Sequence, residues 1–445
     1  MGAFKAYDIR GIYGKDITPE LAYSVGFHLP ELLQCDHIVV GRDVRVSSEE
    51  MFESLTRGIT DAGCDVWNIG LATTPMVYFA TVHLKAGGSV QITASHNPPE
   101  YNGLKISKAM AIPVGENSGL KDLEKMVATK GIKRSDRPGK IIDKGVKYDY
   151  VSFLRQFAPD VSKLNLSIDL SHGMANILVK DLLGKDHHYL YDHLDGTFPA
   201  HEPNPLEEKN CADIKAAVLA NHSDLGIIFD GDADRVMFID ERGRFIQPDY
   251  ITAVMGRYFL KHEKGNVLQD IRTSRSTTEY LEMLGATVHT WKVGHAFAKV
   301  KLKEINGIFG GELAGHYYFR DFFNCDSGML AALIVLQVVV DLHAQGKTFS
   351  SLIDAIVTYA NSGEINFKLE RKDDAMKALY NRYAIQQKPV AVYDFDGYRI
   401  EFSTWWFSVR KSNTEPYLRL VAEAKTQKEL DQHVAEISTI IKDHT

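Results

Sequence analysis

Three aspartates lie at alternating positions in one short segment, and this spacing could bind a divalent cation. Asp230, Asp232 and Asp234 follow the apolar run 225–229 and precede a second apolar run, 236–239. In an extended loop, carboxylates at i, i+2 and i+4 can bring three hard oxygen ligands around one cation. Such a set, without sulfur or imidazole, suits Mg²⁺ better than zinc or copper. The segment therefore predicts a magnesium site beside a strand.

The aspartate segment has two other possible interpretations. A calcium EF-hand loop starting at Asp230 would have Glu241 at its twelfth position, but Arg235 occupies the sixth position, which requires glycine. The flanking residues also favour strands rather than helices. A solvated acidic turn is the second alternative, and the apolar runs on both sides of the segment count against it.

A serine beside a histidine supplies a possible hydroxyl nucleophile. Ser95 and His96 lie in the segment 93–98, after the strand-like residues 89–92. The pair alone is weak evidence, because the Asn-Pro that follows it is an ordinary turn signal. A serine nucleophile together with a three-carboxylate metal site fits phosphoryl transfer, which depends on positioning and on neutralising the developing charge.

Two later segments offer groups that could bind the rest of a ligand. Residues 310–316 read Gly-Gly-Glu-Leu-Ala-Gly-His, in which a carboxylate among glycines can approach a ligand's hydroxyls. These glycines could instead simply permit a tight turn. Residues 410–416 read Arg-Lys-Ser-Asn-Thr-Glu-Pro and offer a guanidinium, hydroxyls and turn amides to a phosphate dianion. A charged β-turn is the alternative for this second segment.

Around these segments, short apolar runs alternate with helix-period stretches, which is typical of α/β folds. The apolar run 38–40 is followed by a predicted capping box at Ser47 and Glu50, and Gly63 would end the helix that starts there. Another apolar run, 164–170, leads into a polar loop. Functional loops belong at the carboxyl ends of such strands.

Length and turn signals divide the chain into four parts. A chain of 445 residues allows three or four domains. The Lys-, Arg- and Gly-containing segment 130–147 reads as a solvated linker. The first three domains read as α/β, and the fourth as α+β, because Asp396-Gly397 is typical of a hairpin turn. The predicted domains are 1–146, 147–242, 243–362 and 363–445.

Overall composition disfavours several classes of function. The 58 acidic and 51 basic residues give a net charge of −7, the wrong sign for wholesale binding of nucleic acid or an anionic membrane. The four cysteines lack the spacing of a zinc module. The longest apolar run, 329–340, is shorter than the roughly 20 residues of a membrane span and reads as a buried helix. No export signal is evident, so we expect a cytoplasmic protein.

The motifs in this order resemble those of the α-D-phosphohexomutases, and the phosphomannomutase/phosphoglucomutase subgroup is the most similar. The resemblance covers essentially the whole chain and rests on the segments 5–11, 93–98, 230–235, 311–316 and 410–416. It implies four domains round a central cleft. The first three would be α/β with mixed sheets, and the fourth would be similar to a TATA-box-binding protein.

The resemblance also implies roles for individual residues. Ser95 would carry the phosphoryl group, and the three aspartates would hold Mg²⁺ together with a phosphoserine oxygen. Arg235 would stabilise the metal loop or the phosphoryl group, and Lys105 and His295 are candidates for general acid/base work on the sugar hydroxyl. The residues implied around Ser95 are Tyr7, Arg10, His96 and Lys105. The residues implied for sugar and phosphate binding are Lys292, Gly294, Glu312, Ala314, His316, Arg410, Ser412, Asn413 and Thr414.

One position departs from the subgroup. Ala314 stands where the subgroup usually has serine, so a hydroxyl expected near the sugar is missing. A neutral hydrogen bond contributes about 0.5–1.5 kcal/mol. Its loss is too small to abolish activity, but it is large enough to blur the preference between epimers.

We therefore predict a Mg²⁺-dependent mutase that moves phosphate between O1 and O6 of mannose or glucose phosphate, with hexose 1,6-bisphosphate as intermediate and activator. Phosphoglucosamine mutase is the alternative by substrate. An aspartyl-phosphate hydrolase with Asp230 as nucleophile and a phosphosugar-binding regulator without turnover are alternatives by class. The third aspartate and the intact Ser95 count against these two. The expected partner is a small phosphosugar, not nucleic acid or a membrane, and no oligomeric state is predicted.

Overall fold

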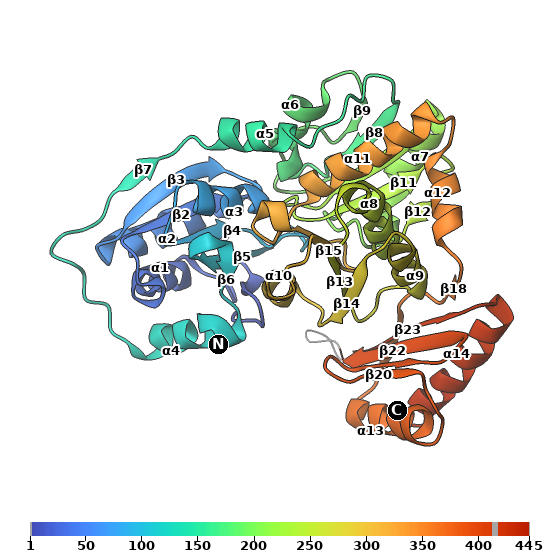
Figure 1. Cartoon of the computed structure of the whole chain (residues 1–445). Coiled ribbons are helices and arrows are strands. Elements are labelled where there is room, and N and C mark those ends of the chain that lie inside the picture. The colour runs from blue at the N-terminus through green and yellow to red at the C-terminus, as the bar shows by residue number, and fades with distance from the viewer. Residues whose placement is uncertain (1, 412–416, 445) are drawn as a thin grey trace.

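Four sheets, each with helices of its own, follow one another along the chain (Figure 1). The computed structural model describes residues 2–411 and 417–444. The first three sheets combine parallel and antiparallel strands, whereas every described strand pair of the fourth is antiparallel. The prediction of three α/β domains with mixed sheets and a C-terminal α+β domain is confirmed.

The first domain is a sheet with helices on both faces. Its strands are β1 (Ile9–Ile12), β2 (His37–Arg42), β3 (Asp65–Leu71), β4 (Gly88–Ile92), β5 (Tyr101–Lys108), β6 (Ile112–Pro113) and β7 (Ile141–Asp143). Its helices are α1 (Pro19–Leu33), α2 (Ser48–Asp61), α3 (Thr74–His83) and α4 (Lys121–Thr129). The sheet order is β1-β5-β4-β2-β3-β7, with β6 paired to β5. In β2, Ile38 and Val40 enter one buried cluster and Val39 enters another, so both faces of the strand are covered.

One local prediction in this domain is wrong, and another is incomplete. Ser47 makes no side-chain cap for α2. Instead, its hydroxyl accepts a hydrogen bond from the Asn102 side chain at 2.8 Å, and Glu50 accepts one from the Tyr13 hydroxyl. Neighbouring segments thus compete for both members of the expected capping box. The segment 130–147 is not all linker, because β7 pairs with β3. All three residues of β7 are exposed, so the strand has no alternation of buried and exposed residues from which the sequence could predict it.

The second domain carries a five-stranded sheet of order β12-β11-β10-β8-β9. Its strands are β8 (Leu166–Asp169), β9 (His188–Leu190), β10 (Leu225–Phe229), β11 (Val236–Asp240) and β12 (Phe245–Ile246). Its helices are α5 (Lys147–Arg155), α6 (Val179–Leu183) and α7 (Ala212–Asn221). Strands β10 and β11 form an antiparallel pair in the register Phe229↔Val236, so the aspartate segment is the loop between them.

The third domain has the sheet order β14-β13-β15-β16-β17. Its strands are β13 (Asn266–Asp270), β14 (Thr287–Trp291), β15 (Phe309–Gly311), β16 (Tyr317–Phe319) and β17 (Cys325–Asp326). Its helices are α8 (Pro248–His262), α9 (Arg275–Met283), α10 (His295–Glu304), α11 (Gly328–Ala344) and α12 (Phe349–Ile356). The apolar run 329–340 lies in α11 and is almost wholly buried, which confirms the prediction of a buried helix.

The fourth domain, at the red end of the chain in Figure 1, is an antiparallel sheet with helices. Its strands are β18 (Ala360–Asn361), β19 (Ile365–Lys368), β20 (Ala391–Tyr393), β21 (Tyr398–Glu401), β22 (Trp405–Lys411) and β23 (Tyr417–Ala424). Its helices are α13 (Lys372–Tyr380) and α14 (Gln427–Lys442). Strands β20 and β21 pair as a hairpin around Asp396 and Gly397, as predicted.

Hydrophobic packing joins the first three domains and leaves the fourth apart. One buried cluster extends from α3 in the first domain, through β8 and β10, to α11 and α12. The fourth domain has its own cluster, formed by residues from Leu369 to Ile441. The contacts between the third and fourth domains include polar pairs, such as Arg275 with Glu401 at 3.2 Å.

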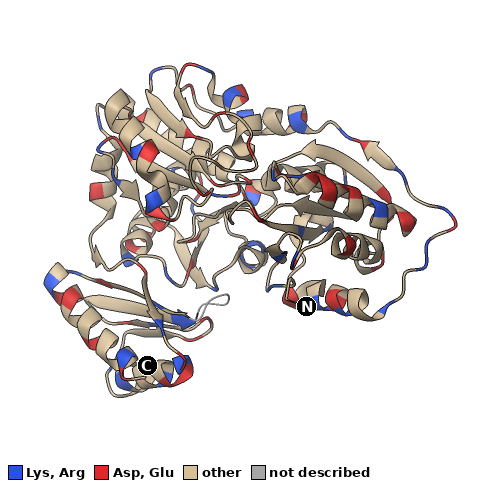
Figure 2. Cartoon of the chain, turned by 180° about the vertical axis from the view of Figure 1, so that it is seen from behind, with Lys and Arg blue, Asp and Glu red and all other residues tan. Residues whose placement is uncertain are grey.

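Among the described residues, no single helix has both the length and the apolar composition to cross a membrane. Taken together, α11 and α12 pass that test, but they are bent by 106° relative to one another. Basic and acidic residues are interspersed over the four domains (Figure 2).

Candidate active site

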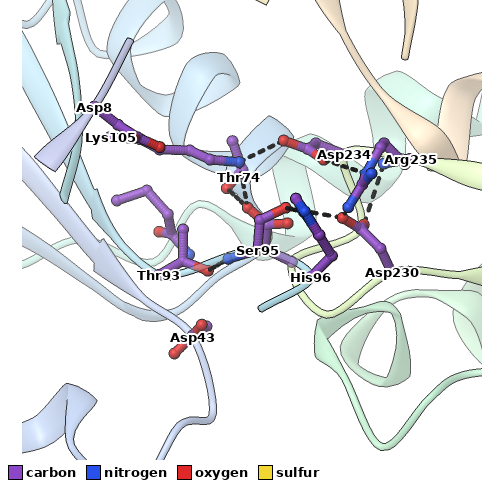
Figure 3. A network of polar contacts seen from close by, with 12 residues as sticks. Asp8, Asp43, Thr74, Thr93, Ser95, His96, Lys105, Asp230, Asp234 and Arg235 are labelled. Atoms are coloured by element: carbon purple, nitrogen blue, oxygen red, sulfur yellow. Dashed lines mark hydrogen bonds and ion pairs between the residues drawn. The ribbon is translucent and has the colours of Figure 1, made fainter. Parts of the chain in front are cut away.

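Ser95 lies in a strained turn at the end of β4. Its backbone has a φ of 52°, in the left-handed region that residues other than glycine seldom adopt. The Ser95 N–H donates to the Thr93 hydroxyl at 2.8 Å, and the Ser95 hydroxyl donates to Oδ2 of Asp230 at 3.0 Å (Figure 3). The predicted nucleophile and the predicted metal loop are therefore in direct contact, although 135 residues separate them.

Glycine at position 231 permits this close approach. A Cβ added to Gly231 would lie 2.5 Å from the carbonyl oxygen of Ser95, a separation that real side chains do not show. The Asp-Gly-Asp pattern of the aspartate loop thus has a steric reason, besides the spacing of its carboxylates.

The three aspartates form a buried set of oxygen ligands. Asp230, Asp232 and Asp234 are at most 1% exposed, and one carboxylate oxygen from each lies within 4.8 Å of the others. Oδ1 of Asp232 and Oδ1 of Asp234 have no hydrogen-bond partner among the described residues. Unpartnered buried carboxylate oxygens are costly unless a cation meets them. The donor set fits Mg²⁺, which prefers hard oxygen ligands.

The charges of this loop are uneven in a way that burial and neighbours explain. Burial, and then the charges of Asp234 and Asp232, raise the pKa of Asp230 to about 8. Burial acts on Asp234 in the same sense, but the Lys105 ammonium and other cations outweigh it and hold the Asp234 pKa below its usual range. Three buried carboxylates in one loop thus need compensating positive charge.

Lys105 and Arg235 supply part of that charge. The Lys105 ammonium lies 2.7 Å from Oδ2 of Asp232 and 2.5 Å from Oδ2 of Asp234. Burial alone would lower the Lys105 pKa, but these two carboxylates raise it, so Lys105 keeps its proton. Nε of Arg235 donates to Oδ2 of Asp230 at 3.1 Å.

The other residues predicted around Ser95 reach the same place. Nδ1 of His96 lies 3.4 Å from the Ser95 hydroxyl. Burial, and then the charges of Arg235 and other cations, hold the His96 pKa well below its usual value, so its ring is neutral. Nη1 of Arg10 donates to the Asn97 side chain at 2.8 Å, which anchors Arg10 to the serine segment.

Two further residues hold the site, and sequence reasoning missed both. Arg45 is buried, and its Nε donates to Oδ2 of Asp43 at 3.1 Å. Its two terminal nitrogens donate to four backbone carbonyl oxygens of the serine segment, those of Ser95, Asn97, Pro98 and Tyr101. The Thr74 hydroxyl donates to Oδ2 of Asp232 at 2.5 Å. A polar loop after β2 is the only sequence signal for Arg45, and it does not reveal these partners.

The predicted sugar segment and the 292–295 loop are in contact within the third domain. Oε1 of Glu312 accepts the Gly294 N–H at 2.9 Å. The His295 and His316 ring centroids lie 6.0 Å apart. The hydroxyl of Tyr7, from the first domain, donates to the carbonyl oxygen of Val293 at 3.3 Å. Residues from the first and third domains thus meet at this loop.

Two histidines here have different electrostatic surroundings. Burial, and then Lys299, lower the His295 pKa to about 3, so that ring is neutral. Burial also acts to lower the His316 pKa, but Asp234 and Asp326 outweigh it and raise it. Nδ1 of His316 lies 2.8 Å from Oδ2 of Asp326. His316, Asp326 and Asp234 also lie close enough to share a cation, but the Lys299 ammonium already pairs with Asp326 at 2.8 Å.

Three of the remaining predicted residues lie in the described part of the chain, and three lie outside it. Ala314 is half-buried in the turn between β15 and β16. The Lys292 ammonium lies 5.7 Å from the Phe297 ring centroid. Nη2 of Arg410 lies 3.2 Å from Oδ1 of Asp396, and Nε of Arg410 is buried without a partner among the described residues. The other predicted phosphate ligands lie outside the described residues; they are Ser412, Asn413 and Thr414.

Comparisons with known proteins cover nearly the whole chain. Family models described as phosphoglucomutase/phosphomannomutase, alpha/beta/alpha domains I, II and III match residues 1–131, 148–243 and 247–359. The model of the C-terminal domain of the same family matches residues 364–440.

Individual relatives agree with these matches. A protein named phosphomannomutase from Escherichia coli strain K12 is 36% identical over an alignment of 436 residues that covers 95% of this chain and 94% of that one. A protein named phosphohexose mutases from Xanthomonas campestris pv. campestris strain B100 is 35% identical, with 99% of each chain covered. The X-ray structure of a phosphoglucomutase/phosphomannomutase family protein from Burkholderia thailandensis has a TM-score of 0.90 and 27% identity, covering 99% of this chain and 97% of that chain.

Proposed function

The chain belongs to the phosphoglucomutase/phosphomannomutase family and is a mutase enzyme, and from that premise we propose that it interconverts hexose 1-phosphate and hexose 6-phosphate through a phosphoserine at position 95. The observation that carries this proposal is the contact of the Ser95 hydroxyl with Asp230 at 3.0 Å. That contact joins the serine segment 93–98 to the carboxylate loop, which supports Ser95 as the nucleophile.

The proposed reaction has two phosphoryl transfers. In the first, the bond between phosphorus and Oγ of Ser95 breaks, and phosphorus bonds to the free hydroxyl oxygen of the hexose monophosphate. That hydroxyl loses its proton, and Oγ of Ser95 gains one. The hexose 1,6-bisphosphate then reorients, and its other phosphoryl group returns to Ser95. The same bisphosphate, supplied from solution, would act as activator by restoring phosphoserine.

The site groups suit the proton movements that these transfers need. Lys105 lies between Asp232 and Asp234 and, with His295, would do the acid/base work on the sugar hydroxyl. Burial holds His295 neutral, so that a ring nitrogen is free to accept the proton of the sugar hydroxyl. Tyr7, Arg10 and His96 would orient the phosphoryl group on Ser95.

Mg²⁺ is the proposed cofactor, held by Asp230, Asp232 and Asp234. When bound, it would draw charge from the phosphoryl oxygens. The fit rests on the buried, partly unpartnered carboxylate oxygens of the loop. Arg235 would hold Asp230 in place, as its contact at 3.1 Å suggests.

Substrate recognition is proposed to divide between two domains. Glu312, with Lys292, Gly294, Ala314 and His316, would contact the sugar. Arg410 would bind the distal phosphate together with the three residues outside the described part of the chain. Because the curated relatives are named phosphomannomutase or phosphohexose mutases, mannose and glucose phosphates are the preferred substrates, with glucosamine phosphate as the alternative.

Three finer proposals complete the assignment. The proposed domain boundaries lie near residues 146, 242 and 362, and β12 and β18, within a few residues of the last two, pair into the sheets of the second and fourth domains. The partner is a phosphosugar, without nucleic acid or membrane. The location is the cytoplasm, which is supported by the free thiols of all four cysteines.

A coupled assay tests the proposal directly. Mannose 1-phosphate, glucose 1-phosphate and glucosamine 1-phosphate would be compared with Mg²⁺ and a hexose 1,6-bisphosphate present. We expect turnover of mannose or glucose 1-phosphate to the 6-phosphate. Release of inorganic phosphate without isomerisation would favour a hydrolase instead.

A further inference from the structure

The hairpin turn at Asp396 lies against both segments that are proposed to bind substrate. Oδ2 of Asp396 accepts the backbone N–H of Val293 at 2.9 Å. Oδ1 of the same carboxylate lies 3.2 Å from Nη2 of Arg410. From the sequence, Asp396 and Gly397 indicate only a turn. In the fold, one carboxylate contacts the 292–295 loop of the third domain and the guanidinium of the fourth.

The shape of the turn fixes the direction of this carboxylate. Gly397 has a φ of 73°, and a Cβ added there would lie 2.4 Å from the Val409 carbonyl oxygen. Only glycine therefore lets the turn press against β22 so closely. Asp396 then faces Arg410, the residue after Val409 on that strand.

The 292–295 loop has anchors in three domains. The Val293 carbonyl oxygen accepts from Tyr7 of the first domain, at 3.3 Å. The Gly294 N–H donates to Glu312 of the third domain, at 2.9 Å. The Val293 N–H donates to Asp396 of the fourth domain, at 2.9 Å. Each anchor comes from a different element, so the position of the loop depends on how the three domains dock.

Other contacts between the third and fourth domains do not end on this loop. Nη1 of Arg399 donates to the carbonyl oxygens of Ile271 and Thr273 at 3.0 and 2.6 Å. Arg275 pairs with Glu401 at 3.2 Å. These contacts can hold the fourth domain in place without Asp396. The role of Asp396 is therefore separable from docking itself.

We propose that Asp396 is a positioning residue that links the 292–295 loop to Arg410. It would fix the position of the sugar-binding loop of the third domain relative to the phosphate-binding guanidinium of the fourth. This inference rests on the proposed function, because that function assigns substrate to both segments. Arg410 uses Nη2 for Asp396, and its Nε remains buried without a partner among the described residues. Asp396 thus orients the guanidinium through Nη2.

Hydrogen exchange of the Val293 amide tests the link without using activity. Asp396→Ala removes the acceptor, and the peptide covering residues 291–297 should exchange about tenfold faster. Asp396→Asn keeps an acceptor but loses the charge, so exchange should rise about threefold to fivefold. Asp394→Asn is the matched control, because Asp394 lies exposed in the same turn and makes no hydrogen bond or ion pair within the described ranges 2–411 and 417–444. Its exchange should stay within about twofold of the unchanged protein.

Kinetics then separates this inference from the proposed function. With glucose 1-phosphate or mannose 1-phosphate, Asp396→Ala should lower kcat/KM by about tenfold or more, with KM and kcat both affected, and Asp394→Asn should not. If Asp396→Ala exchanges faster but the unchanged protein has no mutase activity, the contact between Asp396 and the loop is supported and the proposed function is wrong. Equal exchange of the 291–297 peptide in Asp396→Asn and Asp394→Asn would overturn the link, whatever the activity. If Asp396→Ala fails to fold, the exchange rate of Asp396→Asn still tests the proposal.

Discussion

Nη2 of Arg45 donates to the carbonyl oxygen of Ser95 at 2.9 Å, from a site where the arginine is 2% exposed. The buried guanidinium of Arg45 thus stabilises the strained backbone of Ser95 through its carbonyl oxygen. Such a guanidinium is itself costly to bury, and Asp43 compensates it. The conformation of the proposed nucleophile therefore depends on a residue that need not touch substrate.

Arg45→Ala should destabilise the protein strongly. It leaves the Asp43 carboxylate buried without its cation and removes the guanidinium donor from four carbonyl oxygens, which costs about 3–5 kcal/mol. Urea unfolding would measure this loss. Arg137→Ala, at an exposed arginine, should change the free energy of unfolding by about 0.5 kcal/mol or less. Equal stability of the two variants would contradict the role assigned to Arg45.

Ser95→Ala should abolish mutase activity while the protein stays folded. The substitution removes the proposed phosphoryl acceptor, and it costs only the contacts of the Ser95 hydroxyl with Asp230 and His96. Phosphopeptide mapping of the unchanged protein should place phosphate on Ser95, and Ser162→Ala, at an exposed serine, should keep full activity. If no acid-stable phosphate is found on Ser95, or if an acyl phosphate is found on Asp230, the hydrolase class would be favoured.

Asp232→Asn should weaken Mg²⁺ binding and turnover more than it changes the folding midpoint. The amide keeps the shape of the side chain, but it removes one of the three charges that meet the cation. Calorimetric titration with Mg²⁺ would report the affinity, with Asp186→Asn as the exposed control. Full activity of Asp232→Asn in excess EDTA would remove the metal from the reaction.

Asp249, at the start of α8, should make stability depend on pH. Burial raises the pKa of its carboxyl to about 7, whereas an unfolded aspartate titrates near 3.9. Between roughly pH 4 and pH 7 the folded state therefore binds more protons than the unfolded state, and the free energy of unfolding falls as the pH rises.

Asp249→Asn cannot titrate and should lose that part of the pH dependence. Relative to the variant, the unchanged protein should lose on the order of 2–4 kcal/mol of stability between pH 4 and pH 8. Urea unfolding at several pH values would measure both slopes. Parallel slopes would show that Asp249 is not buried as described.

Ala314→Ser should alter sugar preference, since it restores a hydroxyl beside the Glu312 segment. A new hydrogen bond of about 0.5–1.5 kcal/mol would change the ratio of kcat/KM for mannose and glucose phosphates by roughly two- to tenfold. Glu312→Gln should harm both substrates, because Glu312 also accepts the Gly294 N–H. An unchanged ratio for Ala314→Ser would mean that position 314 does not face the sugar.

The motif segments were predictable because their residue types carry the chemistry. The apolar runs beside 230–235 predicted two strands, and β10 and β11 are those strands. The backbone contacts of Arg45 and Asp396 could not be predicted, because every residue type offers the carbonyl oxygen or N–H that these side chains bind. The capping box predicted at Ser47 is absent for a related reason. The Ser47 hydroxyl, which the local pattern predicts would cap the helix, instead accepts a hydrogen bond from Asn102, 55 positions further along the chain.

The shared core of the first three domains has a consequence for the order in which the chain folds during synthesis. Helix α3 contacts β17 within this shared cluster, so the first domain cannot complete its burial until residues near 326 have left the ribosome. Until then, part of α3's apolar surface stays open to chaperones or to misassembly. The fourth domain, with a core of its own, has no such dependence and can condense last without delaying the rest. Slow translation before residue 328 would therefore lengthen the vulnerable interval, whereas a pause after residue 356 would not.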